Sequence, residues 1–236
     1  MAGIGEAGRL AQTRRDGPRG AASRRSPGPP VPEDEDHRLR ALRRYCVPDA
    51  PLEPGFERIA NLARALFDTP TAMVSLVDET RQWFKARRGF EPAETPRDWA
   101  FCAYTILSDE PLVVPDTLRD PLFAENPLVR GGPRIRFYAG APIVTPDGLR
   151  LGSVCVASPR PRASVPQSED LARLMDLAGI AMDQLELRLR TRALAQAVSE
   201  RDAALARTGL SSGHKAAAAR DGEHRARHGR RAALPA

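Results

Sequence analysis

The fold is decided by residues 67–88, which read FDTPTAMVSLVDETRQWFKARR. Residues 71–77 form a run of mostly β-branched and apolar side chains, long enough for one buried strand. Asp78-Glu79-Thr80 ends that run, and residues 82–88 continue as a second strand. Two strands separated by so short a turn predict an antiparallel hairpin.

Two helices are expected before the hairpin. The nearer one shows apolar side chains at a helical period, which predicts one buried stripe: Phe56, Ile59, Ala60, Ala63, Leu66 and Phe67. A shorter helix is predicted over residues 34–45, because an acidic run such as 33–36 suits a helix N-terminus. We expect it to end before Pro48, since proline cannot continue a helix.

The segment after the hairpin mixes short elements. Asp98 can cap a helix that runs to about residue 107. Residues 112–114 read as a short strand. The stretch 117–133 holds three prolines and two adjacent glycines, so we expect a loop with one helical turn at 121–124.

Two strong strand patterns and a long helix complete the folded part. The strands are predicted at 135–144 and 151–157, joined across a Pro-Asp-Gly turn in which Gly148 supplies a positive φ. A helix then starts near Gln167 and continues past Leu189. This order predicts an α+β fold with a central antiparallel sheet of five or six strands and packed helices.

Five ordered segments resemble bacterial GAF domains, of the subclass found in front of sensor histidine kinases and diguanylate cyclases. The resemblance covers residues 38–189 and rests on the hairpin 67–85, Phe101-Cys102-Ala103, residues 111–116, residues 136–142 and Gly152-Ser153-Val154-Cys155-Val156. It implies a GAF/PAS-like sheet with helices on one face and a ligand-type pocket on the other. The pocket would lie between the sheet and the segments 98–107 and 117–133.

The resemblance implies a cytoplasmic sensory or regulatory module that binds a small molecule or partner. The side chains expected to line the pocket are Trp83, Phe101, Cys102, Tyr104, Asp116, Phe123 and Tyr138. Tyr104 departs from the subclass, which has histidine at this position, so a phenol replaces an imidazole. Two interpretations stay open, because aromatic side chains also fill cores and Asp116 also suits a turn. The ligand is left open too: a cyclic nucleotide, another metabolite, an ion or none.

The chemistry-bearing residues argue against an enzyme. No histidine lies between Tyr45 and Leu205, although general acid–base catalysis and haem ligation mostly use imidazole. Cys46, Cys102 and Cys155 form no CxxC pattern, so no metal site is expected, and we expect Cys102 and Cys155 to be buried structural thiols. Residues 117–136 contain no cysteine, which disfavours covalent bilin, and no other cofactor is indicated. The enzymatic alternative is a small GAF-scaffold enzyme resembling a methionine-sulfoxide reductase.

The charge is distributed unevenly along the chain. The chain carries a formal net charge of +6, yet residues 1–32 hold six arginines against two acids and residues 206–236 hold seven basic residues against two acids. The middle is therefore net −3. Both ends lack an apolar period, so we predict two disordered basic tails with weak contact to nucleic acid or anionic lipid. A tail-driven nucleic-acid-binding adaptor is the third alternative. No apolar run suits a signal peptide or a membrane span, which favours the cytoplasm.

The last helix has two apolar patterns. Its first part repeats at spacings of 3, 4, 3 and 4 and is expected to pack on the sheet within the domain 33–189: Leu171, Leu174, Ala178, Ala181 and Leu185. A second row continues into the extension 190–205: Leu187, Leu194, Val198 and Leu205. This row predicts pairing with a second chain, a homodimer, and a relay to a histidine kinase or cyclase partner.

Overall fold

The structure, a computed structural model, describes residues 28–45 and 53–229, with side chains up to residue 207. Most of the predicted N-terminal tail, the expected helix break before Pro48 and residues 230–236 lie outside the described residues. The elements in chain order are α1 Glu35–Tyr45, α2 Pro54–Phe67, β1 Thr71–Val77, β2 Arg81–Arg88, β3 Glu94–Pro96, the 3-10 helix η1 Arg97–Trp99, α3 Phe101–Thr105, β4 Leu112–Val114, α4 Pro127–Arg130, β5 Phe137–Val144, β6 Arg150–Ser158 and α5 Ser168–Gly229.

The strands form one antiparallel sheet of six strands in the order β3-β2-β1-β6-β5-β4. The predicted hairpin lies at its middle, because β1 pairs with β2 on one side and with β6 on the other. Every residue of β1 is buried. This is expected of a largely apolar strand that lies at the centre of a sheet covered on both faces. The expected α+β class is confirmed.

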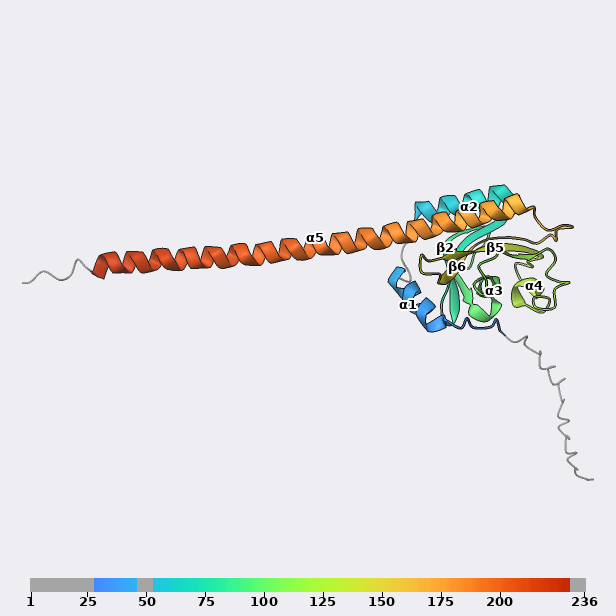
Figure 1. Cartoon of the computed structure of the whole chain (residues 1–236), viewed down its shortest axis with the longest axis horizontal. Helices are drawn as coiled ribbons and strands as arrows, with labels where there is room; N and C mark the ends of the chain where they lie inside the picture. The colour runs from blue at the N-terminus through green and yellow to red at the C-terminus, as the bar shows by residue number, and fades with distance from the viewer. Residues whose placement is uncertain (1–27, 46–52, 230–236) are drawn as a thin grey trace, which may run out of the picture.

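Helices α2 and α5 lie side by side on one face of the sheet, and α3 and α4 lie on the other (Figure 1). The core under α2 and α5 is aliphatic and aromatic, with α1 closing one end through Leu42 and Tyr45. A second, separate core fills the opposite face around Phe101, Phe123 and Tyr138. The helices expected on one face are present, and the opposite face, where the resemblance implies a pocket, carries this second core.

A β-bulge in β2 decides which face each side chain of the hairpin takes. The pairing with β1 steps from Val74–Ala86 to Ser75–Phe84, so the register shifts by one residue at Lys85. Trp83 packs in the core under α2 and α5, whereas Phe84 packs in the opposite core. Trp83, an expected pocket residue, thus lies on the face away from the expected pocket.

Residues 94–130 differ in detail from the sequence-based expectation. The edge strand β3 is not predicted, because three residues ending in proline show no alternation. Asp98 lies inside η1, and the next helix begins at Phe101 without a side-chain cap. The expected turn at 121–124 is present, closed by the bond from the Ala124 N–H to the Asp120 carbonyl. The additional helix α4 starts where the Asn126 side chain accepts from the Leu128 N–H.

Helix α5 is longer than expected. It spans 62 residues, so residues 206–229, expected to be disordered, continue the helix in the structure. This stretch holds six alanines and four arginines, which are among the strongest helix formers, beside four glycines. The prediction of disorder rested on the missing apolar period alone and did not take helix propensity into account.

Candidate functional site

Four of the expected pocket residues come together on the face opposite α2 and α5. The Phe101 ring stacks between Phe123 and Tyr138, with centroid distances of 4.4 and 5.0 Å. Cys102 neighbours Phe101 on α3 and receives a hydrogen bond of 3.5 Å from the Tyr138 hydroxyl. The sequence therefore located this cluster, although its members contact one another and not an open space.

Tyr104 borders the same cluster from the outside. It is half-buried and meets the Phe123 ring edge-on at 4.9 Å. Burial raises the pKa of its hydroxyl, and the nearby carboxylates of Asp120 and Asp98 raise it further. The phenol that replaces the subclass histidine thus acts as an apolar surface against Phe123 and stays protonated at neutral pH.

The cavity that remains within this cluster is small. It has a volume of about 10 Å³ and is lined by Met73, Gln82, Phe90, Phe101, Cys102, Leu128, Ile135 and Tyr138. A volume of this size holds about one water molecule. Stacked aromatic side chains occupy the space where the resemblance implies a ligand.

Asp116 is engaged by a neighbouring arginine. Its two carboxylate oxygens accept hydrogen bonds from Arg136 Nε and Nη2 at 2.9 and 2.8 Å. The hydrogen bond from Arg136 lowers the pKa of the Asp116 carboxyl, and the Leu118 N–H adds to this effect. Asp116 joins the segment after β4 to the residue before β5 through Arg136, and it also accepts the local hydrogen bond from the Leu118 N–H at 3.2 Å that a turn-forming residue makes.

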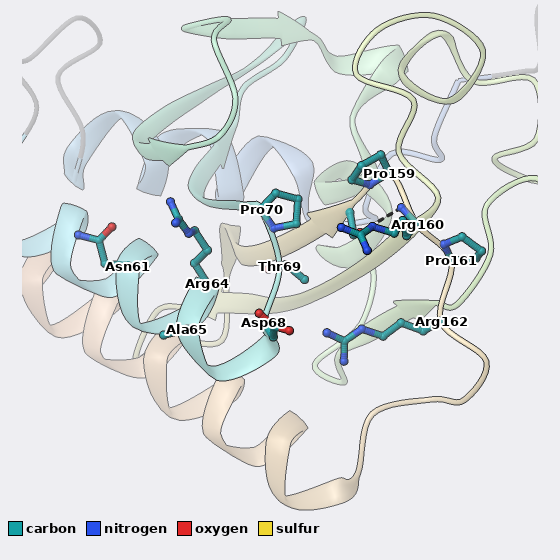
Figure 2. A pocket seen from close by; sticks show the side chains of 11 residues that line it. Asn61, Arg64, Ala65, Asp68, Thr69, Pro70, Pro159, Arg160, Pro161 and Arg162 are labelled. Carbon is teal, nitrogen blue, oxygen red and sulfur yellow. Dashed lines mark hydrogen bonds between the residues drawn. The ribbon is translucent and has the colours of Figure 1, made fainter.

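A much larger cleft opens elsewhere, between the end of α2 and the segment that follows β6. Its volume is about 880 Å³, within the range of small-molecule sites. Its lining residues come from the last turns of α2, the α2–β1 connection and residues 158–162, as Figure 2 shows: Asn61, Arg64, Ala65, Asp68, Thr69, Pro70, Ser158, Pro159, Arg160, Pro161 and Arg162.

The lining of this arginine cleft is positive. Three arginines face one carboxylate, that of Asp68, so the lining carries a net charge of +2. Arg64 and Arg160 are exposed, and within the described residues their guanidinium groups have no ion-pair partner. Sequence patterns do not reveal this site, because Arg64 and Arg160 are 96 residues apart in the chain. Only the fold brings them to one cleft.

Arg162 holds the far wall of the cleft in place. Its guanidinium donates to the carbonyl of Phe67 and lies 4.6 Å from the centroid of the Phe137 ring. Its backbone N–H donates to the Pro115 carbonyl at 2.9 Å. The segment that leads from β6 into α5 is therefore fixed at one residue of the cleft.

Two further contacts fasten α5 to the domain where the helix leaves it. The Tyr45 hydroxyl at the end of α1 donates to the Glu186 carboxylate. Arg188 pairs with Glu53, which also pairs with Lys85 of β2 at 3.4 Å. The Lys85 side chain is 2% exposed and lies over the Trp83 ring at 5.4 Å. Both α1 and the sheet are therefore connected to α5 at this point.

Two kinds of site are not found in the described part of the chain. Across residues 28–45 and 53–229, no three His, Cys, Asp or Glu side chains gather as they would around a metal ion. Among the same residues, no helix has both the length and the apolar composition to cross a membrane.

A six-stranded antiparallel sheet between two helical layers, with a long helix leaving it, defines a domain of the α+β type. Residues 51–185 match the GAF domain model, which is more than half of the chain. The chain belongs to the GAF domain family.

Known relatives agree with this assignment. Over 157 residues the chain is 42% identical to the cyclic di-GMP phosphodiesterase PA2567 of Pseudomonas aeruginosa, a match that covers 66% of this chain and 27% of that protein. The chain thus corresponds to about a quarter of that relative's length.

Two solved structures are similar to this chain, and the one with a TM-score of 0.50 shows the shared fold. The bacteriophytochrome RpBphP3 from the photosynthetic bacterium R. palustris is 14% identical, with a TM-score of 0.50 over 73% of this chain and 41% of that one. The blue-light-absorbing form of the Thermosynechococcus elongatus PixJ GAF domain is 17% identical, with a TM-score of 0.49 over 69% of this chain and 94% of that one.

Proposed function

We propose that this GAF domain is a regulatory module that binds a small anionic molecule in the arginine cleft and relays its binding through α5. The observation that carries the proposal is the position of the cleft. One wall is the end of α2 and the other is the segment leading into α5, and the two helices also pack on each other. A ligand that bridges the walls would change how α5 sits on the sheet.

The cleft chemistry favours a phosphate or carboxylate group. Guanidinium groups form paired, charge-assisted hydrogen bonds to such anions. Arg64 and Arg160 supply these donors from opposite walls, and Asp68 between them can accept from a hydroxyl or amine of the same ligand. Asp68 holds a left-handed conformation with φ of 44° at the end of α2, which places it at the cleft.

The signal would leave the domain along α5. Its apolar side chains beyond the domain are exposed to 60% at Leu187, 67% at Leu194 and 63% at Leu205. Leu187 and Leu194 are seven residues apart, as are Val198 and Leu205, which is the repeat of a coiled coil. We therefore propose that α5 pairs with a second copy of the chain or with the matching helix of an output enzyme.

The output enzyme would be one of cyclic di-GMP metabolism. This proposal rests on the relative named as a cyclic di-GMP phosphodiesterase, whose remaining length this chain does not span. A cyclase or histidine kinase partner, expected from the resemblance, would use the same helix.

The test is anion binding to the full chain, measured by isothermal titration calorimetry with pyrophosphate at constant ionic strength. We expect saturable binding that weakens at least ~10-fold in the variant Arg64→Gln/Arg160→Gln, the scale expected when charged hydrogen bonds are lost. The matched control is Arg130→Gln, an exposed arginine of α4 that pairs with Glu125 outside the cleft. Equal weakening by the control, or no saturable binding to the unaltered chain, would refute the cleft as the site.

A further inference from the structure

Two cysteines from different elements meet inside the core on the face opposite α2 and α5. Cys102 of α3 is 1% exposed and Cys155 of β6 is 0% exposed. Their Sγ atoms lie 3.7 Å apart, although the residues are 53 positions apart in the chain. Sulfur atoms in van der Waals contact need only a small approach to form a covalent bond.

Hydroxyl groups surround this pair within an otherwise apolar core. The Tyr138 hydroxyl donates to Cys102 Sγ at 3.5 Å and shares a hydrogen bond of 2.8 Å with Thr105 Oγ1. Ser75 and Ser153 are fully buried on neighbouring strands, with their hydroxyl oxygens 3.4 Å apart. Burying polar groups costs free energy that aliphatic side chains would not incur. Their collection around two sulfurs points to a role for the sulfurs.

These hydroxyls favour the thiolate form of one cysteine. Burial alone would raise the pKa of the Cys102 thiol, but hydrogen bonds from Cys155, Ser153, Ser75 and Tyr138 outweigh it and lower the pKa to about 6. The hydrogen bond with Cys102 and burial raise the pKa of Cys155. Since the thiolate is the nucleophilic form of cysteine, the pair is divided into an attacking and a resolving thiol.

The small cavity of about 10 Å³ reaches Cys102. Gln82, another of its lining residues, is 3% exposed, and its Oε1 is buried with no hydrogen-bond partner among the described residues. A buried unpaired acceptor is costly and marks a place where a polar molecule fits. The cavity therefore suits a small hydrogen-bond donor beside the Cys102 sulfur.

We propose that Cys102 and Cys155 are a redox-sensitive dithiol that hydrogen peroxide oxidises to a disulfide. The Cys102 thiolate attacks one peroxide oxygen, an S–O bond forms, the O–O bond breaks, and the departing hydroxide takes a proton and leaves as water. Cys155 sulfur then attacks the Cys102 sulfur, the S–S bond forms, and the sulfenic hydroxyl leaves with the Cys155 proton as a second water. The two thiols lose two electrons, and the peroxide gains them.

The disulfide would alter the packing of this face. A disulfide holds its sulfurs about 2 Å apart, so the Sγ atoms of Cys102 and Cys155 must approach each other from their present separation of 3.7 Å. Phe101, next to Cys102, stacks on Phe123 and Tyr138, and these rings would shift with it. The proposal is independent of the arginine cleft, because the two sites lie on different surfaces of the sheet and share no residue.

The experiment uses the full chain with Cys46→Ser, so that only the two buried thiols are counted. The folded protein is treated with hydrogen peroxide, quenched, unfolded and alkylated with iodoacetamide before intact-mass and peptide analysis. We expect the loss of two hydrogens, two fewer alkylations and a cross-linked peptide joining Cys102 to Cys155. Full alkylation of both thiols after peroxide, or a product that links two chains, would overturn the proposal.

Two measurements test whether the environment of the Cys102 thiolate, rather than simple access of peroxide to the two thiols, sets the rate of oxidation. Tyr138→Phe should slow oxidation several-fold, because Cys102 loses a hydrogen bond to its thiolate, whereas Tyr104→Phe removes a hydroxyl outside the cluster and should leave the rate unchanged. If Tyr138→Phe does not fold, the pH dependence of the unaltered pair still decides. Oxidation by peroxide should be half-maximal near pH 6, and a half-maximal rate near pH 9 would contradict Cys102 as the attacking group.

Discussion

The hydroxyl of Tyr45 donates a hydrogen bond to the carboxylate of Glu186, 141 residues further along the chain. The first residue ends α1, and the second lies on α5 as it leaves the sheet. Burial raises the pKa of the Tyr45 hydroxyl, and the Glu186 carboxylate raises it further, so the hydroxyl remains a donor at neutral pH. Helix α1 thereby takes part in setting the position of α5.

Removing this hydroxyl should loosen the join between the two helices. Tyr45→Phe is expected to lower the free energy of unfolding by about 1.5–3 kcal/mol, the usual contribution of a hydrogen bond to a charged group. Urea denaturation measures it. Tyr104→Phe is the matched control, because the described residues give its hydroxyl no partner, and it should change stability by less than about 0.5 kcal/mol. Equal effects of the two substitutions would contradict a specific Tyr45–Glu186 contact.

A second prediction concerns the acid stability set by Glu35. Burial alone would raise the pKa of its carboxyl, but hydrogen bonds from Arg38 and Arg97 outweigh burial and lower the pKa from 4.5 to about 2. A lowered folded pKa means that Glu35 stabilises the protein above pH 4.5 and that this contribution disappears as pH falls toward 2.

Glu35→Gln should therefore destabilise the protein at pH 7 by about 2 kcal/mol, since Arg38 is fully buried and loses its counter-charge. The difference between the two proteins should shrink as pH falls from 4.5 to about 2. Thermal denaturation over this pH range measures it. A difference that stays constant with pH would show that the carboxylate charge is not responsible.

The third prediction compares two glycines. A Cβ at Gly140 would lie 2.3 Å from the Tyr138 hydroxyl oxygen, so Gly140→Ala must displace that ring. We expect destabilisation of about 1–3 kcal/mol, typical of overpacking. A Cβ at Gly179 of α5 would meet nothing within 4 Å, so Gly179→Ala should stabilise the helix by about 0.5–1 kcal/mol. Denaturation curves that move the same way for both would disprove the packing account.

The fourth prediction concerns the exposed row on α5. If α5 pairs with a second copy, Leu187→Asp/Leu194→Asp should convert a dimer to a monomer in analytical ultracentrifugation, because charges at a coiled-coil seam oppose pairing. Ala193→Asp adds a charge on the same exposed stretch but outside the row, and should leave the oligomeric state unchanged. A protein that is monomeric before any substitution would rule out pairing with its own copy.

Local sequence patterns were enough to locate most strands. The bounds of β1 and β4 agree with the predicted 71–77 and 112–114, because Asp78 and Pro115 end apolar runs sharply. The placement of Trp83 was beyond such patterns. Alternation fixes only that Trp83 and Phe84 face opposite ways, and the bulge at Lys85 then decides which face each one takes.

The site was harder to predict than the fold. Phe101, Cys102, Phe123 and Tyr138 lie together in one buried core, on segments that the resemblance places around a pocket. Whether aromatic side chains line an opening or fill it depends on ring contacts between distant segments, which a sequence does not show. The pairing of Asp116 with Arg136 and the gathering of Arg64 with Arg160 depend on the fold in the same way.

The length of α5 converts small movements into large ones. At about 1.5 Å per residue, its 62 residues span about 93 Å, and the 40 residues from Arg190 to Gly229 account for about 60 Å of that length. Figure 1 shows this part projecting away from the sheet. The helix is held by the domain near Glu186 and Arg188, and a tilt about this point would move its far end the most. One degree of tilt there would move the far end by about 1 Å, which is about two thirds of the helical rise per residue. A small side-chain rearrangement in the domain would therefore give a larger displacement at the end of the helix.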